Sequence, residues 1–225
     1  MKIGILGGSF NPVHNGHVRM AIEVLERLSL DRVELVPAKQ PPHKQEGDIL
    51  PFDLRLELVN QAIEGVPGLG SNPLEGEREG PSFTCDTLHC YRAEQPESDF
   101  FFIVGASTFL ELDQWRRGLE IPSMASIAVV NRWDAATAVA GFIKAHWPEA
   151  KQEPEGVWTF PEGHTIRLVD IPRLDIKGRH IRERWLERRS LRFLVPPGVE
   201  TFLEDHTAEV QKYWGNRSQP VSAGK

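Results

Sequence analysis

The chain has 225 residues and a mass of 25.4 kDa, which suits one large domain or one domain with an appendage. Hydrophobic residues make up 40% and charged residues 26%, which excludes a collagen-like or a wholly disordered protein. The 26 basic and 32 acidic side chains give a net charge of −6, so we expect no nucleic-acid partner and only a local phosphate site.

No apolar stretch approaches the roughly 20 residues that span a bilayer, and the N-terminus lacks the long apolar core of a signal peptide. We therefore expect a cytoplasmic protein with no membrane partner. Cys85 and Cys90 lie five residues apart, a spacing typical of neither a metal site nor a disulfide framework, so both are expected to be reduced thiols. The sequence leaves the oligomeric state open, a homo-oligomer included.

The first predicted elements are a strand, a glycine-rich turn, a helix and a second strand. Residues 2–6 form a short apolar run that ends at Gly7 and Gly8, as a buried strand would. Residues 17–28 carry apolar side chains at helical spacing, and residues 32–37 read as the next strand. Two strands joined through a helix predict a parallel sheet.

The same alternation continues along the chain. We predict helices at 52–64 and 177–189, strands at 100–105, 126–131 and 165–169, and a surface excursion between 147 and 163, where prolines and glycines gather. This pattern predicts an α/β fold: a single Rossmann-like domain over residues 1–205 with a doubly wound, mainly parallel sheet and the site at the carboxyl ends of its strands. Residues 206–225 are expected to form a partly flexible tail.

The turn at residues 7–17 is the best candidate for a functional site, because open α/β sheets bind ligands where a strand leads into a helix. Adjacent glycines let backbone N–H groups approach a ligand, and a helix N-terminus favours phosphate. His14 and His17, three apart around Gly16, can both donate to phosphate oxygens. A glycine pair is also ordinary turn punctuation, and single histidines are more often structural. The turn is neither G-x-G-x-x-G nor a Walker sequence, and no ligand set for a protein-bound metal accompanies the histidines.

Residues 8–17 read GSFNPVHNGH and match, at every defined position, the G-x-F-x-P-x-H-x-G-H signature of the HxGH nucleotidyltransferase superfamily. Within it, the chain resembles the bacterial nicotinate-mononucleotide adenylyltransferases. The further matching segments follow in family order over residues 2–203: PPHK at 41–44, Arg55 at a helix start, PSFTCDTL at 81–88, FIVG at 102–105 with Trp115, and LVP at 194–196.

The resemblance implies an enzyme of NAD biosynthesis that joins the AMP moiety of ATP to nicotinate mononucleotide, giving deamido-NAD and pyrophosphate, with Mg2+ bound mainly through the ATP phosphates. By resemblance, the catalytic residues are His14, His17 and Arg182. The implied ATP-binding residues are Gly7, Gly8, Ser9, Phe10, Gly16, His17, Gly105, Ser107, Ile176, Lys177, Arg179 and Arg182. The implied acceptor-binding residues are His43 and Lys44 for its phosphate, Thr84 for the ring substituent and Trp115 for stacking on the ring.

The chain departs from the family pattern at two places. Lys177 and Arg179 stand where the family has hydroxyl residues, and we expect these cations to substitute for them. Ser107 stands where an aspartate is common, which weakens the expected contact with a ribose. Three alternatives stay open: a related transferase that uses nicotinamide mononucleotide, phosphopantetheine or a CTP-dependent acceptor, a nucleotide-binding protein without catalysis, and, least favoured, a nucleic-acid binder built on the arginine-rich late helix.

Overall fold

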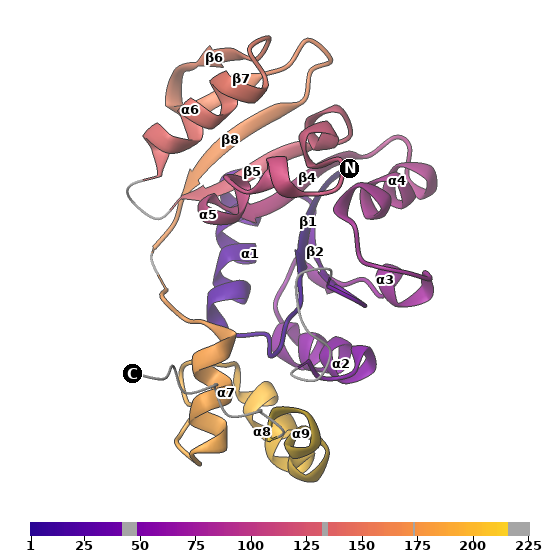
Figure 1. The fold of residues 1–225 in the computed structure, drawn as a ribbon, viewed down its shortest axis with the longest axis vertical. Coiled ribbons are helices and arrows are strands. Elements are labelled where there is room, and N and C mark those ends of the chain that lie inside the picture. Colours follow the sequence, from indigo (N-terminus) through magenta and orange to yellow (C-terminus); the bar gives the residue numbers. More distant parts are fainter. Residues whose placement is uncertain (42–48, 132–134, 173, 216–225) are drawn as a thin grey trace, which may run out of the picture.

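One twisted sheet organises the chain in the computed structural model, which describes residues 1–41, 49–131, 135–172 and 174–215 (Figure 1). Over these residues eight strands run in the order β3-β2-β1-β4-β5-β8-β7-β6. The strands are β1 (Lys2–Gly8), β2 (Arg32–Pro37), β3 (Leu69–Ser71), β4 (Asp99–Gly105), β5 (Ser126–Asn131), β6 (Lys151–Glu153), β7 (Val157–Thr159) and β8 (Thr165–Asp170).

The strand order creates a switch point between β1 and β4. From β1 the chain moves outward through β2 and β3, and it then returns to place β4, β5 and β8 on the other side, all in parallel. β1 therefore pairs with β2 along Ile3 to Gly8 and with β4 from Lys2 to Ile5. Open sheets of this kind bind ligands in the crevice at the carboxyl ends of such a pair. The predicted Rossmann-like, mainly parallel fold is confirmed.

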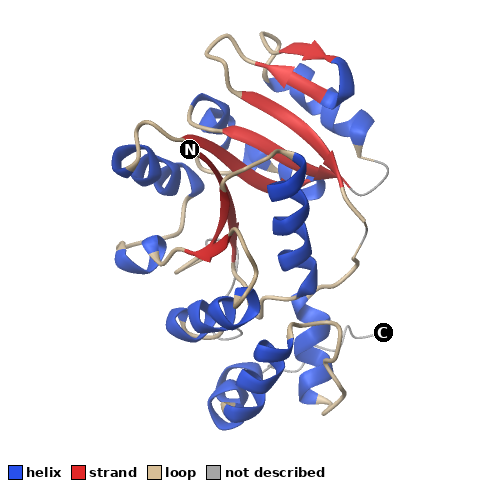
Figure 2. Ribbon diagram, turned by 180° about the vertical axis from the view of Figure 1, so that it is seen from behind, coloured by secondary structure: helices blue, strands red, loops and turns tan. Residues whose placement is uncertain are grey.

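Helices cover both faces of the sheet. They are α1 (Asn15–Arg27), α2 (Phe52–Ile63), α3 (Leu74–Glu77), α4 (Thr84–Glu94), α5 (Ala106–Phe109), α6 (Ala136–His146), α7 (Gly178–Leu186), α8 (Pro197–Asp205) and α9 (Thr207–Trp214). One buried apolar cluster joins α1, α2 and α7–α9 to one face, and a second joins α4 and α6 to the other. Seen from behind, α1 crosses in front of the sheet (Figure 2). No helix in the described ranges is long and apolar enough to cross a membrane.

The stretch between residues 147 and 163 differs from its prediction. Instead of an irregular excursion, β6 and β7 form an antiparallel hairpin that extends the sheet beyond β8. Trp158 and Phe160 alternate with polar neighbours and are buried, so the hairpin has an apolar inner face. The glycines that suggested irregular structure lie at turns, where Gly156 and Gly163 adopt positive φ.

The C-terminal segment contributes to the fold as far as Trp214. α9 follows α8 directly, and Trp214 is 1% exposed, with its ring edge-on to Trp185 at a centroid distance of 5.3 Å. The expected tail from residue 206 thus includes a packed helix, while residues 216–225 lie outside the described part of the chain. The late helix ends at Leu186 rather than 189, because Arg188 adopts a left-handed φ of 55°. Cys85 and Cys90 are both free thiols, as predicted.

Candidate active site

The two histidines of the signature turn lie together at the start of α1. Their rings stack with centroids 3.6 Å apart and planes 21° apart, and His14 is buried. The backbone N–H of His14, the N-cap residue, donates to Nδ1 of His17 at 3.3 Å. Because Nδ1 accepts this bond, a neutral His17 carries its proton on Nε2 and can donate from there.

Two neighbours hold these rings in place. A Cβ on Gly16 would lie 3.0 Å from Nδ1 of His14, so a larger residue at this position would push against the His14 ring. Phe10 is 1% exposed with a φ of 42°, and its ring packs edge-on to His17 at 5.0 Å. Phe10 therefore lies behind the histidines and supports them from the core.

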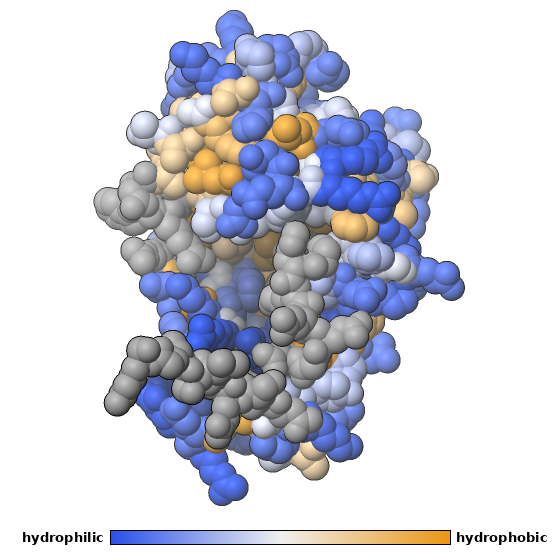
Figure 3. Space-filling model, viewed as in Figure 1, coloured by the Kyte–Doolittle hydropathy of each residue, from blue (hydrophilic) through white to orange (hydrophobic). Residues whose placement is uncertain are grey.

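A cavity of about 730 Å³, the histidine cavity, opens in front of these rings. It lies between the carboxyl ends of β1, β4 and β5 and the first residues of α1, α5 and α7. Its polar lining side chains are imidazoles, hydroxyls and one ammonium group: His14, His17, Ser107, Thr108 and Lys177. The space-filling view shows a recess on this side of the molecule, above the C-terminal helices (Figure 3). No described side chain lining this cavity is a carboxylate, so its chemistry suits an anion.

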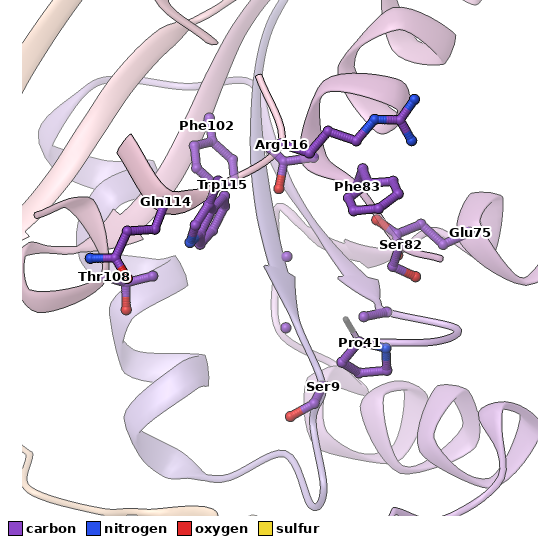
Figure 4. A pocket seen from close by; sticks show the side chains of 14 residues that line it. Ser9, Pro41, Glu75, Ser82, Phe83, Phe102, Thr108, Gln114, Trp115 and Arg116 are labelled. Atoms are coloured by element: carbon purple, nitrogen blue, oxygen red, sulfur yellow. The ribbon is translucent and has the colours of Figure 1, made fainter. Parts of the chain in front are cut away.

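A second cavity of about 750 Å³, the aromatic cavity, adjoins the first. The two share Gly7, Phe102, Thr108 and Trp115 as lining residues. Figure 4 shows Trp115 and Phe102 pointing into the aromatic cavity, with Ser82 and Phe83 opposite them. Thr84 also lines it and is the first residue of α4, where backbone N–H groups have no partner within the helix. The space between the tryptophan and this helix start suits a flat ring with a polar substituent.

Arg55 holds together the loops that line the aromatic cavity. It is 1% exposed, and it donates to the carbonyl oxygens of Leu50 (2.8 Å), Ser9 (2.9 Å), Ala38 (2.6 Å) and Lys39 (3.2 Å). Burial lowers the pKa of Arg55 to about 10, against a smaller opposing effect of the nearby Glu75 carboxylate. The guanidinium stays protonated at neutral pH, so one cation ties the signature turn to the loop after β2.

The wall of the aromatic cavity is held by bonds between two loops. The backbone N–H of Gln40 donates to Oγ of Ser82 (3.1 Å), and the Ser82 N–H donates to the Gln40 carbonyl (3.1 Å). Nζ of Lys39 reaches the Arg78 carbonyl at 2.7 Å. Behind this wall, the Thr87 hydroxyl donates to the buried Glu75 at 2.6 Å, which fixes the first turn of α4. The position of Thr84 is thus determined from outside its own helix.

Most of the residues expected from the sequence line the two cavities. The histidine cavity contains Gly7, His14, Gly16, His17, Gly105, Ser107, Ile176, Lys177 and Trp115, and the aromatic cavity contains Gly7, Gly8, Ser9, Thr84 and Trp115.

The other expected residues are not among the described residues that line the cavities. Phe10 lies beneath the two histidine rings. Arg179 points to solvent and pairs with Glu183 at 2.8 Å. Arg182 donates to the Asn11 carbonyl at 2.7 Å and so contacts the signature loop. His43 and Lys44 lie outside the described residues.

Five further residues of the aromatic cavity belong to neither a predicted site nor a matching segment: Ala38, Glu75, Thr108, Gln114 and Arg116. Arg116 directly follows Trp115, so its proximity to the ring site could have been inferred from the sequence. Glu75 lies in the short helix α3, whose four residues carry no clear periodicity, and nothing in the sequence points to its burial.

A switch-point sheet with two stacked histidines at the first turn defines a nucleotidyltransferase of the HxGH class, and comparison with known proteins agrees. The profile of the cytidylyltransferase-like family matches residues 5–184, and the chain belongs to this family.

Two sequence relatives identify the group within this family to which the chain belongs. A Maridesulfovibrio salexigens protein named "Probable nicotinate-nucleotide adenylyltransferase" is 35% identical over 95% of this chain and 100% of its own length. A Geotalea uraniireducens protein of the same name is 40% identical over 91% and 96%. The chain therefore belongs to the nicotinate-nucleotide adenylyltransferases.

A solved structure, Plasmodium falciparum nicotinic acid mononucleotide adenylyltransferase complexed with NaAD, has a TM-score of 0.71 at 16% identity over 92% of this chain and 97% of that chain. It supports the fold alone.

Proposed function

We propose that this protein transfers the AMP moiety of ATP to nicotinate mononucleotide, releasing pyrophosphate and forming deamido-NAD, in the cytoplasm and as a step of NAD biosynthesis. One observation carries the proposal: a histidine-lined cavity and an aromatic cavity meet at Gly7 and Trp115. Two nucleotides bound in these cavities bring their phosphates together beside the glycine turn. The family membership given above supports the same reaction.

ATP fits the histidine cavity. The His14–His17 pair at the start of α1 offers donors to its phosphates, and Gly7 and Gly105 leave open space where a side chain would otherwise project. Ser107 is available for a ribose hydroxyl with one neutral hydroxyl rather than a carboxylate. Lys177, the N-cap residue of α7, contributes the full positive charge that the family's hydroxyl residue lacks. These groups support binding of a triphosphate.

The chemistry rests on positioning and charge stabilisation. A phosphate oxygen of the mononucleotide attacks the α-phosphorus of ATP in line, the bond to the β-phosphate oxygen breaks, and pyrophosphate leaves. His17 donates from Nε2 to a phosphate oxygen as negative charge develops there, and Lys177 adds a positively charged group. Arg182 supports this geometry through the Asn11 carbonyl.

Mg2+ fits the site as a partner of the nucleotide. The histidine cavity offers nitrogen donors and hydroxyls, and no cluster of three or more acidic, histidine or cysteine side chains suited to a metal occurs among the described residues. Mg2+ prefers oxygen ligands and commonly binds through substrate phosphates and water. It would be held by the ATP phosphates, where it supplies charge neutralisation.

The acceptor fits the aromatic cavity. Its pyridine ring stacks on Trp115, and its carboxyl group lies against the first N–H groups of α4 near Thr84. We further propose that His43 and Lys44 bind its phosphate, because they directly follow the cavity residue Pro41 and the intervening Pro42. We expect no nucleic-acid or membrane partner, and we leave a homo-oligomer open.

The test is pyrophosphate release with ATP and Mg2+, measured in parallel with nicotinate mononucleotide, nicotinamide mononucleotide and phosphopantetheine. We expect strong preference for the first acceptor, and His17→Ala supplies the inactive control. Detectable ATP binding with no turnover of any acceptor would contradict the proposal and indicate a nucleotide-binding protein without catalysis. Preference for phosphopantetheine would assign the chain to a different acceptor.

A further inference from the structure

Arg116 lines the aromatic cavity directly beside Trp115, and neither the histidine signature nor the phosphate-binding groups account for it. Its guanidinium carbon lies 4.5 Å from the centroid of the Phe83 ring, a cation–π distance. Figure 4 shows this side chain running from beside Trp115 outward past Phe83, with its guanidinium pointing away from Trp115. The planar guanidinium thus lies at the outer rim of the cavity, beside the Phe83 ring that precedes α4.

The charges around this end do not cancel. Arg55, Arg78 and Arg116 face two carboxylates, Glu75 and Asp86, which leaves one net positive charge in this guanidinium cluster. Glu75 interacts electrostatically with Arg55, and Asp86 is shared by Arg78 at 3.4 Å and Arg116 at 4.0 Å. Arg116 has the longer of these two separations, so its charge is the less neutralised.

Arg116 is also the member of the cluster that a ligand can reach. Arg55 is enclosed and bonded to four carbonyl oxygens. Arg78 donates to the Thr87 hydroxyl at 3.2 Å and pairs with Asp86. The Arg116 side chain is 59% exposed and lines the cavity, so it can turn toward a bound anion without breaking a short ion pair.

A cation near the ring substituent can distinguish a carboxylate from a carboxamide, which the start of α4 alone cannot do. The neutral N–H groups of α4 can donate to either a carboxylate or a carboxamide oxygen, since both substituents present an acceptor oxygen. A guanidinium favours the carboxylate, because it combines full charge with paired donors. We propose that Arg116 is the residue that selects the negatively charged ring substituent, so that the acid form of the pyridine mononucleotide is preferred over the amide. This inference rests on the proposed function, because it takes that reaction's acceptor to be the ligand of the aromatic cavity.

The test compares Arg116→Gln with Arg117→Gln as a matched control. Arg117 is the next residue, and its guanidinium pairs with Glu120 at 2.7 Å, so its replacement removes the same charge without altering the cavity lining. The measured quantity is the ratio of kcat/KM for nicotinate mononucleotide to kcat/KM for nicotinamide mononucleotide. We expect Arg116→Gln to lower this ratio about tenfold, chiefly through KM of the acid, and Arg117→Gln to leave it unchanged.

Salt and a conservative variant separate charge recognition from a structural role. Raising NaCl from about 0.05 to about 0.5 M should lower the selectivity of the wild type and leave that of Arg116→Gln flat, because the interaction is between a partly exposed cation and an anion. Arg116→Lys, which keeps the charge and loses the fork, should retain part of the selectivity. An equal loss for both acceptors would mean that Arg116 only supports Phe83, and would overturn the proposal.

Direct binding measurements distinguish the role of Arg116 from the proposed reaction. Quenching of tryptophan fluorescence by each mononucleotide gives both affinities without turnover. A protein that binds the acid more tightly than the amide through Arg116 but releases no pyrophosphate would support this inference and contradict the proposed reaction. Unchanged affinity ratios in Arg116→Gln would overturn the inference, whatever the activity.

Discussion

Replacing Arg55 by methionine tests whether one buried cation organises both cavities. The substitution keeps an unbranched chain of similar length and removes every donor to the carbonyl oxygens of Leu50, Ser9, Ala38 and Lys39. Hydrogen bonds from a charged group contribute about 1.5 kcal/mol each at the lower end, so the four together supply about 6 kcal/mol.

Desolvation opposes this gain. Burial lowers the pKa of Arg55 to about 10, more than two tenfold steps below its ordinary value, which at about 1.4 kcal/mol for each step corresponds to a cost of about 3 kcal/mol. Because the folded-state pKa is the lower one, the cost is fully present below pH 10, neutral pH included. The difference predicts that Arg55→Met lowers the free energy of unfolding by about 3 kcal/mol and Tm by about 6 to 12 °C.

Urea and thermal unfolding of Arg55→Met measure this loss, with Arg92→Met as the control. Arg92 is exposed and makes a single carbonyl bond, to Met124 at 2.9 Å, so its replacement should cost less than about 1 kcal/mol. Below the melting transition, KM for the acceptor should rise because Ser9 and Ala38 line the aromatic cavity and lose their anchor, and KM for ATP should rise because Ser9 belongs to the turn that carries the two histidines. A loss no larger than that of Arg92→Met would refute the reasoning.

The remaining predictions concern single groups. His17→Ala should lower kcat about 100-fold with little change in KM. Trp115→Ala should raise KM of the pyridine substrate about tenfold and KM for ATP less, because Trp115 lines both cavities but stacks on the pyridine ring; steady-state kinetics test both. Lys177→Ala should raise KM for ATP about tenfold and weaken its salt dependence, which kinetics at two ionic strengths would show. Burial raises the pKa of Glu34, but hydrogen bonds from Tyr91 and other donors outweigh this and lower it. Its stabilisation is therefore present above its ordinary pKa of 4.5 and lost as the pH falls below it, so urea midpoints of Glu34→Gln should vary less between pH 7 and acid pH than those of the wild type.

The sequence predicts the central part of the fold well because each of its elements carries its own pattern. Buried parallel strands such as β4 are continuous apolar runs, and α1 has one apolar stripe. β6 and β7 have three residues each, too few to show a period. β7 is stabilised by pairing with β8, and β6 by pairing with β7, rather than by local preference. Short strands that depend on pairing with a neighbouring strand therefore cannot be predicted from their own sequence.

The candidate site likewise has one part that the sequence predicts and one part that it does not. The histidine side could be predicted because its signature is local: Gly7, His14 and His17 fall within one turn. The wall of the aromatic cavity depends on contacts between segments far apart in the chain, such as the bonds between Gln40 and Ser82, 42 residues apart. No periodicity or spacing encodes such a pairing, so Glu75 was missed, whereas Arg116 could have been inferred from its position next to Trp115.

Asn11 explains how the departures at residues 177 and 179 leave the histidine cavity intact. Its side-chain oxygen accepts from the Leu50 N–H at 3.1 Å and from Nε1 of Trp214 at 3.2 Å, and its carbonyl accepts from Arg182. A Cβ on Gly178 would lie 3.1 Å from that same carbonyl, so the start of α7 packs closely on the signature loop. The approach of α7 is thus set by groups other than the replaced hydroxyls. Substituting them changes which chemical group faces the cavity, an ammonium on Lys177, while the backbone that presents it stays in register with the histidines.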